Sequence, residues 1–97
     1  MLEITAQHSS SRGSFVATLE GQVIGRVDYV RLGTEAEPGT FDLIHTGVEP
    51  AHEGKGYGRQ LVHAAAEWAE AQGYTLVASC PYAAKILERR SRAPRPE

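Results

Sequence analysis

Every second residue is glycine in the segment His52-Glu53-Gly54-Lys55-Gly56-Tyr57-Gly58. Glycine lets a backbone approach a ligand closely and turn several N–H groups toward it. Residues 57–72 follow with apolar side chains at helical spacing, so the segment is expected to lead into a helix N-terminus, where amides are unpaired and the dipole is positive. Lys55 and Arg59 add full positive charges. The sequence therefore predicts a site for a phosphate or pyrophosphate group.

Three better-known phosphate loops fit this segment poorly. A P-loop has four residues between its first glycine and a Gly-Lys-Ser/Thr end, and the chain has no such run. A dinucleotide-binding loop has its third glycine one residue later and belongs to a larger doubly wound sheet. An RNA-clamping GXXG loop has two residues between its glycines and lies on a more basic face. We therefore expect a different class of phosphate ligand.

The segments around the glycines alternate between strand and helix patterns. Period-two alternation of apolar side chains predicts strands over residues 2–6, 15–20, 23–30, 41–48 and 75–80. Helical spacing predicts helices over residues 57–72 and 82–90.

The order of these segments predicts a mixed fold, α+β with an α/β crossover. The first four strands should form an antiparallel meander, with Gly21 at positive φ in one hairpin turn and Gly33–Gly39 as an exposed loop. The unit 41–80 should be a right-handed parallel crossover, in which a strand is followed by loop, helix and strand, and a last helix then ends the fold.

The composition indicates one compact domain. Hydrophobic residues make up 41% of the 97 residues and charged residues 23%, which are ordinary globular values. Residues 1–92 are expected to form the domain and residues 93–97 a flexible tail. The single cysteine, Cys80, excludes an internal disulfide, and no apolar run approaches the ~20 residues of a membrane span. We expect a soluble cytoplasmic protein without a membrane partner.

The distribution of charge indicates which classes of binding partner to expect. The formal net charge of −2 argues against a nucleic-acid partner, although residues 85–97 carry five cations and two anions. No cluster of His, Cys, Asp and Glu has metal-ligand spacing, so no metal site is expected. His52 and His63 are interpreted as surface groups.

The segment Val48–Leu61 resembles the acetyl-CoA-binding signature of the GCN5-related N-acetyltransferases. That signature has Arg or Gln, two free positions, Gly, one free position, and Gly or Ala, so Gly56 and Gly58 match its two small residues. Glu53 stands where Arg or Gln is usual, and a carboxylate cannot donate a hydrogen bond to a phosphate. The segments His45–Val48 and Cys80–Lys85 extend the resemblance to a minimal subgroup of the family, over about half the chain.

This resemblance implies a truncated acyl-CoA N-acyltransferase fold with acetyl-CoA as its cofactor. Full-length relatives continue with two further strands and a longer substrate-binding region. The strand backbone at residues 46–48 should bind the pantetheine arm like an added strand, and the loop amides should bind the pyrophosphate. Lys85 should flank the thiol end or the adenosine phosphate. The implied cofactor-binding residues are Thr46, Gly47, Val48, Glu53, Gly54, Lys55, Gly56, Tyr57, Gly58, Arg59 and Lys85.

Three residues are candidates for catalysis. His45 has a side chain suited to a general base, or it is simply a hydrogen-bonded strand residue. Cys80 is an acyl acceptor or a proton donor, or a small buried hydrophobic residue. Tyr82 resembles the last-helix tyrosine that protonates the leaving thiolate in relatives.

With these residues, the resemblance implies an acetyl-CoA-dependent N-acetyltransferase acting on a small-molecule or protein amine. The alternative is a non-catalytic acyl-CoA-binding or sensing module, and an RNA-binding domain is a third hypothesis that the charge disfavours. The protein is expected to be a monomer, or a weak homodimer that pairs through an exposed final strand.

Overall fold

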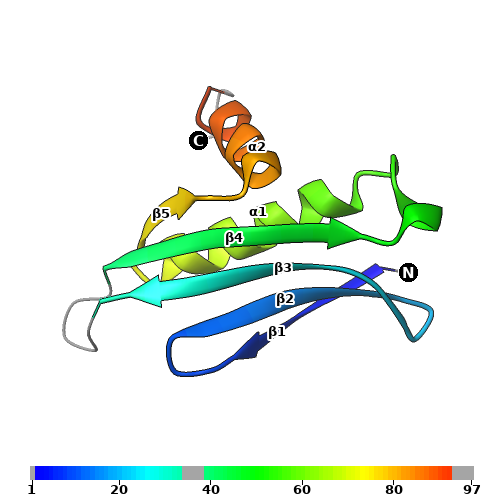
Figure 1. Ribbon diagram of the computed structural model, residues 1–97, viewed down its shortest axis with the longest axis horizontal. Coiled ribbons are helices and arrows are strands. Elements are labelled where there is room, and N and C mark those ends of the chain that lie inside the picture. The colour runs from blue at the N-terminus through cyan, green and yellow to red at the C-terminus, as the bar shows by residue number, and fades with distance from the viewer. Residues whose placement is uncertain (1, 34–38, 93–97) are drawn as a thin grey trace.

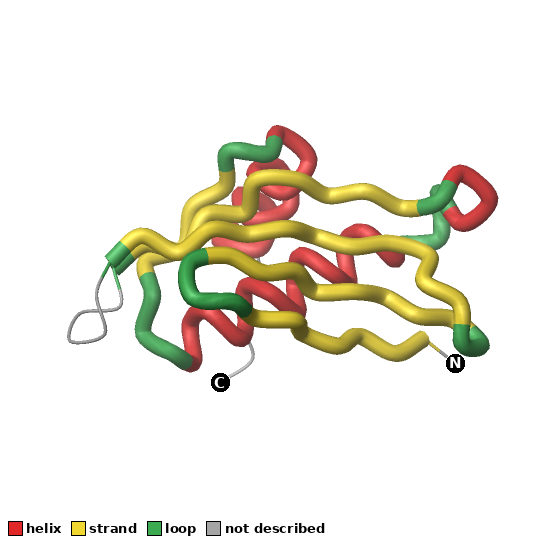
Figure 2. Tube along the Cα trace, turned by 60° about the horizontal axis from the view of Figure 1, so that its bottom comes forward, coloured by secondary structure: helices red, strands yellow, loops and turns green. Residues whose placement is uncertain are grey.

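The protein is a mixed sheet of five strands with its helices packed on one face, as the computed structural model shows for residues 2–33 and 39–92 (Figures 1 and 2). None of the helices in these ranges is long and apolar enough to cross a membrane. The predicted tail, 93–97, and residues 34–38 of the predicted loop lie outside the described residues. The elements in chain order are β1 (Leu2–His8), β2 (Arg12–Leu19), β3 (Gln22–Leu32), β4 (Thr40–Val48), the 3-10 helix η1 (Pro50–His52), α1 (Tyr57–Ala71), β5 (Thr75–Ala78) and α2 (Pro81–Arg92).

The strands lie in the sheet in the same order as in the chain. The β1–β2, β2–β3 and β3–β4 pairs are antiparallel, whereas β4 and β5 are parallel and joined through α1. The predicted meander and the predicted parallel pairing are therefore confirmed. The β2–β3 turn has positive φ at Glu20 and at Gly21, as predicted for the glycine.

Several strands and helices extend beyond the predicted ranges. β1 and β2 pair without a break from Leu2 opposite Leu19 to His8 opposite Gly13, so the strands include residues 7–8 and 12–14, which lie outside the predicted strands 2–6 and 15–20. Backbone hydrogen bonds form this ladder independently of the side chains. A pattern of apolar side chains therefore does not show where the polar ends of the strands lie. α2 similarly runs to Arg92, past the predicted end at Arg90.

β5 is shorter than predicted, and this difference shapes the molecule. The expected strand to Cys80 ends at Ala78, because the next residue, Ser79, turns to Asp42 of β4. The Ser79 amide donates to Asp42 Oδ1 at 2.8 Å, and its hydroxyl donates to Oδ2 at 2.7 Å. The last β4–β5 pair is Leu43 with Ala78, so β4 continues to Val48 with β3 as its strand neighbour and without β5.

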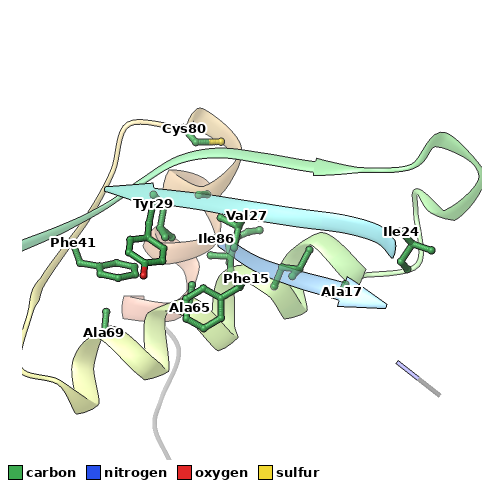
Figure 3. Packing of buried hydrophobic residues seen from close by; sticks show 14 residues of the cluster. Phe15, Ala17, Ile24, Val27, Tyr29, Phe41, Ala65, Ala69, Cys80 and Ile86 are labelled. Atoms are coloured by element: carbon green, nitrogen blue, oxygen red, sulfur yellow. The ribbon is translucent and has the colours of Figure 1, made fainter. Parts of the chain in front are cut away.

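The core lies between the sheet and α1. Tyr29 and Phe41 stack with ring centroids 4.2 Å apart, as Figure 3 shows, and Ala65 and Ala69 of α1 face them without exposed surface. Small side chains on α1 let the helix approach the sheet closely. Cys80 joins the same cluster from its edge, at the start of α2 (Figure 3). The predicted apolar face of α1 is confirmed.

The pair of hydrogen bonds from Ser79 predicts a measurable loss of stability. We expect Asp42→Ala to lower the free energy of unfolding by about 1–2 kcal/mol, because two hydrogen bonds to a carboxylate near the surface are lost. Urea denaturation followed by circular dichroism measures this change. Glu3→Ala, which removes an exposed carboxylate from β1, is the control. Equal stabilities for the two variants would contradict this account of how β5 ends.

Candidate functional site

A cavity of about 870 Å³ opens between the end of β4, the glycine loop and the two α-helices. It gathers every cofactor-binding residue predicted from the sequence except Lys55, which is exposed and does not line it. Tyr82, a predicted catalytic residue, also lines the cavity, whereas His45 and Cys80 do not. The cavity is therefore the candidate site, and the binding role of its residues stays a prediction.

The glycine loop adopts a conformation that its glycines permit. Gly54 and Gly56 have φ values of 81° and 82°, in the left-handed region that side chains with a Cβ rarely adopt. Gly56 is the N-cap of α1 and offers no side-chain hydrogen bond to the first-turn amides. These amides and the helix dipole thus face the cavity mouth as an anion-binding surface.

Gly58 is required for space and not for a left-handed backbone, unlike Gly54 and Gly56. It lies within the first turn of α1, and a Cβ added to it would lie 2.5 Å from the Tyr82 hydroxyl oxygen. The missing side chain therefore makes room for Tyr82, a residue that is 48% exposed. Tyr82 links the beginning of α2 to the beginning of α1 beside the glycine loop.

The open edge of β4 forms another wall of the cavity. Thr46, Gly47 and Val48 line the cavity and pair with β3, while β5 has already ended. A strand with one side unpaired presents N–H and C=O groups to an extended ligand. The cavity thus combines an anion-binding loop with an edge that suits a chain of amide groups.

Cys80 lies behind this wall, at the start of α2. It is 8% exposed, and its Sγ is 3.7 Å from Oγ1 of Thr46, which does line the cavity. Burial acts to raise the pKa of the thiol, but hydrogen bonds from the backbone of Ala83 and Tyr82 and from Thr46 together outweigh it, so the pKa lies below its ordinary value.

His45 faces the opposite side of the sheet. Strict alternation from the buried Phe41 and Leu43 would turn His45 toward the helices, but the β3–β4 register shifts between Asp28 and Tyr29. The shift places His45 opposite Asp28. Thr46 is then opposite the buried Val27 and takes the helix side. A bulge of one residue exchanges the faces in this way.

The surroundings of His45 are polar. Asp28, its partner across the strands, accepts a hydrogen bond from the Ser14 hydroxyl at 2.6 Å and lies 3.4 Å from Nε of Arg26. His45 and Arg26 line a shallower cavity of about 300 Å³ on this face. The structure therefore brings Cys80 and Tyr82 together at the start of α2 and leaves His45 across β4 from them.

Comparison with protein families settles the broader relationship. The sequence profile described as GCN5-related N-acetyl-transferase matches residues 14–94. The chain belongs to the GCN5-related N-acetyltransferase family. A comparison with curated proteins found no match.

Solved structures of acetyltransferases share the fold of this GCN5-related chain. A ribosomal-protein-alanine N-acetyltransferase from Brucella melitensis biovar Abortus 2308 has a TM-score of 0.67 at 21% identity, over 93% of this chain and 71% of its own. An aminoglycoside acetyltransferase from an uncultured soil metagenomic sample, in complex with sisomicin, has a TM-score of 0.66 at 21% identity, over 93% and 62%. AAC(6')-Iy, in complex with the bisubstrate analogue CoA-S-monomethyl-acetylneamine, has a TM-score of 0.60 at 21% identity, over 87% and 60%.

The TM-scores establish that the fold is shared, and the covered shares of length show how much of each larger structure this chain matches. The chain spans 62% of the soil acetyltransferase and 60% of AAC(6')-Iy. The predicted GCN5-related acyltransferase fold is therefore confirmed, in a form that covers part of these larger structures.

Several residues that line the cavity of this GCN5-related domain were not predicted from the sequence. His52 and His63, interpreted as surface groups, both line the cavity, as do Arg89 and Arg90. Nδ1 of His52 is buried and has no hydrogen-bond partner among the described residues. Helical spacing could have found two of them, because His63 follows Arg59 and Arg89 follows Lys85 by four residues. Among the described residues no group of His, Cys, Asp and Glu is arranged to hold a metal ion.

The environment of Cys80 predicts its reactivity with pH. Because its pKa is lowered, the alkylation rate with iodoacetamide should reach half its maximum at a lower pH than for a cysteine in an unstructured peptide. Thr46→Val removes the hydroxyl near Sγ and should move this midpoint back to higher pH. Rates measured by intact mass across a pH series test both statements, with Thr5→Val on the exposed strand β1 as the control. A midpoint at or above that of the peptide would contradict the assignment.

Proposed function

We propose that the protein is an acetyl-CoA-dependent N-acetyltransferase that transfers the acetyl group from the thioester to an amine. The observation that carries this proposal is the meeting of the open β4 edge and the left-handed glycine loop in one cavity. Membership of the GCN5-related family supports acyl-CoA-dependent acetyl transfer in general. The specific reaction and the roles below are our proposal for this chain.

The cavity residues fit coenzyme A by their chemistry. The pyrophosphate would accept hydrogen bonds from the amides of residues 54–59, and the amide-bearing pantetheine arm would run along Thr46, Gly47 and Val48. Glu53 is exposed at the end of η1, so its carboxylate can remain in water while its backbone belongs to the loop. Lys55 would act at longer range, because it lies outside the cavity lining.

Acetyl-CoA supplies an activated acyl thioester. Transfer forms a carbon–nitrogen bond to the amine and breaks the carbon–sulfur bond, while the amine loses one proton and the departing thiolate gains one. Tyr82 would give that proton; its hydroxyl lies beside Gly58, and both residues line the cavity. His45 would take the amine proton from an acceptor approaching on the outer face, where Asp28 lies opposite it.

Cys80 has two possible roles in this scheme. It could accept the acetyl group as a thioester before the amine does, or it could donate a proton to the departing thiolate. Its lowered pKa and its contact with Thr46 support a reactive thiol, whereas its burial behind the cavity wall supports a packing role. Mass analysis of the protein after exposure to acetyl-CoA separates the two.

A non-catalytic acyl-CoA-binding or sensing module is the second candidate function. The observation that favours it is the position of His45 across β4 from Cys80 and Tyr82, which leaves the candidate catalytic groups divided between two faces. Such a module would bind coenzyme A and release no free thiol.

The acceptor is proposed only as an amine, either small or carried by a protein. The fold is shared by proteins named for aminoglycosides and for ribosomal-protein alanine, so it accommodates both kinds of acceptor. A cytoplasmic location, and a monomer or weak homodimer, are part of the same proposal.

Binding of coenzyme A can be tested with two matched glycine variants. Gly56→Val should weaken CoA binding at least about tenfold, because a branched side chain disfavours the left-handed loop that presents the amides. Gly73→Val is the control, since Gly73 has a φ of 87° at the other end of α1 and lies outside the cavity. Isothermal titration calorimetry measures both. Equal losses of affinity would show that backbone strain alone is responsible and would contradict the loop's role.

Catalysis is tested by release of free thiol from acetyl-CoA with and without candidate amines. We expect release that depends on the amine, and a rate reduced at least about tenfold by Tyr82→Phe or His45→Gln. An acetyl adduct on the protein that is lost in Cys80→Ala would identify a covalent intermediate. Binding of coenzyme A with no thiol release for any amine would favour the sensing module.

A further inference from the structure

A second cavity lies on the face of the sheet that the helices leave open. Its volume is about 300 Å³, and its walls come from the start of β3 and the end of β4, which lie side by side in Figure 1. Gly47 and Val48 line both this cavity and the larger one beside the glycine loop. The backbone of β4 is therefore the common wall of the two cavities.

Gly47 leaves the outer side of this wall bare. It has no side chain, and a Cβ added to it would lie 3.4 Å from Nε2 of His45, with no other described contact within 4 Å. The imidazole of His45 therefore lies against Gly47, and its Nε2 is at the segment of strand that separates the two cavities.

Charged groups of both signs surround Gly47. Arg26 lies opposite it on β3, with a side chain that is 61% exposed. Glu49 follows two residues after Gly47, and its amide donates a hydrogen bond to the Ile24 carbonyl at 2.7 Å, which continues the pairing of the strands. Residues two apart in a strand share one face, so Glu49 joins His45 and Gly47 in one row. Both charged residues line the cavity.

The guanidinium of Arg26 has donors available for a ligand. Its Nε lies 3.4 Å from Oδ1 of Asp28, which also accepts a hydrogen bond from the Ser14 hydroxyl. Its two terminal amino groups form no hydrogen bond with a described residue. A guanidinium binds a carboxylate through such N–H groups in a bidentate manner. Arg26 is therefore suited to hold a carboxylate that enters the cavity.

This lining suits a small molecule with one charge of each sign. Arg26 supplies a cation and Glu49 an anion, while Val23, which is 56% exposed, and Pro50 add apolar surface. Arg26 and His45 are diagonal neighbours on the two strands, with Cβ atoms about 7 Å apart, so both reach one small ligand. An α-amino acid carries an ammonium and a carboxylate on one carbon atom, beside a side chain.

We propose that this cavity holds the acceptor of the acetyl group and that the acceptor is a free α-amino acid. The carboxylate binds Arg26. The amine lies over Gly47, with His45 on one side and Glu49 on the other. The open edge of β4 lets this amine meet the thioester, because β5 has ended at Ala78. The inference rests on the proposed function, since it names the acceptor class of the same reaction.

The carboxylate positions the amine and takes no part in the bond changes. The ammonium loses one proton to water before it reacts. The neutral nitrogen then forms the bond to the carbonyl carbon while the carbon–sulfur bond breaks. His45 takes the proton that this nitrogen loses, and the departing thiolate gains one, so the products are an N-acetylamino acid and coenzyme A.

Release of free thiol from acetyl-CoA by the full chain, with a panel of common amino acids and their carboxamides, tests the proposal. The carboxamide keeps the amine and the side chain and removes the negative charge. We expect kcat/KM to be at least about tenfold higher for the best amino acid than for its carboxamide, because the carboxamide loses the charged pair with Arg26. The carboxamide has the less basic amine, so a larger share of neutral amine cannot explain this preference.

Two matched arginine variants locate the recognition. Arg26→Gln should bring the ratio close to one by raising KM for the amino acid, while the affinity for coenzyme A in calorimetry stays that of the wild type. Arg12→Gln removes another exposed cation, at the start of β2 and outside both cavities, and should keep the wild-type ratio.

The outcomes separate this proposal from the one it rests on. If carboxamides, peptides or polyamines release thiol as fast as the amino acids or faster, or if Arg26→Gln keeps the wild-type ratio, the amino acid acceptor is wrong and the proposed function stands. If coenzyme A binds but no amine releases thiol, both are wrong. Equal reductions of the ratio by Arg26→Gln and Arg12→Gln would indicate a general charge effect and would also overturn the acceptor site.

Discussion

The separation of β4 from β5 is the constraint on which the rest of the site depends. Two hydrogen bonds from Ser79 to Asp42 end the ladder after Ala78, and the chain then turns into α2. If β5 continued along β4, it would cover the edge at Thr46, and α2 could not begin beside the glycine loop. The open strand edge, the lowered pKa of Cys80 and the contact of Tyr82 with Gly58 all follow from this one departure from regular pairing.

Charge is distributed unevenly over the molecule in a way that suits an anionic ligand. The formal net charge is −2, yet the cavity between the helices is lined by basic groups. A concave basic surface on a slightly acidic protein concentrates anions locally without making the whole molecule bind polyanions. Arg90 donates two hydrogen bonds to the Glu70 carboxylate, whereas among the described residues no salt bridge is formed by Arg59, Lys85 or Arg89.

The features of the fold that depend on local sequence signals were predictable, whereas the features that depend on contacts between distant residues were not. The glycine loop, α1 and the meander follow from glycine spacing and apolar periodicity, which a short window of sequence contains. The end of β5 depends on Asp42 and Ser79, 37 residues apart, so the predicted strand was two residues too long. The face occupied by His45 depends on a bulge in the β3–β4 pairing, which no alternation pattern reveals. Helical spacing relates His63 to Arg59 and Arg89 to Lys85, but the packing of the two helices that brings both pairs to one cavity is not visible in a short window of sequence.

The order of the strands also bears on how the molecule assembles. All antiparallel pairs join strands that are neighbours in the chain, so the meander needs only short loops to close. The parallel strand β5 attaches through the long crossover that contains α1, and α2 follows it after two residues, Ser79 and Cys80, which contact β4. The candidate site is therefore completed by β5 and α2, and closing the long crossover to β5 costs more chain entropy than closing the hairpins. Local detachment of that part would remove the site while the meander persists, and a bound ligand would stabilise the last third of the chain most strongly.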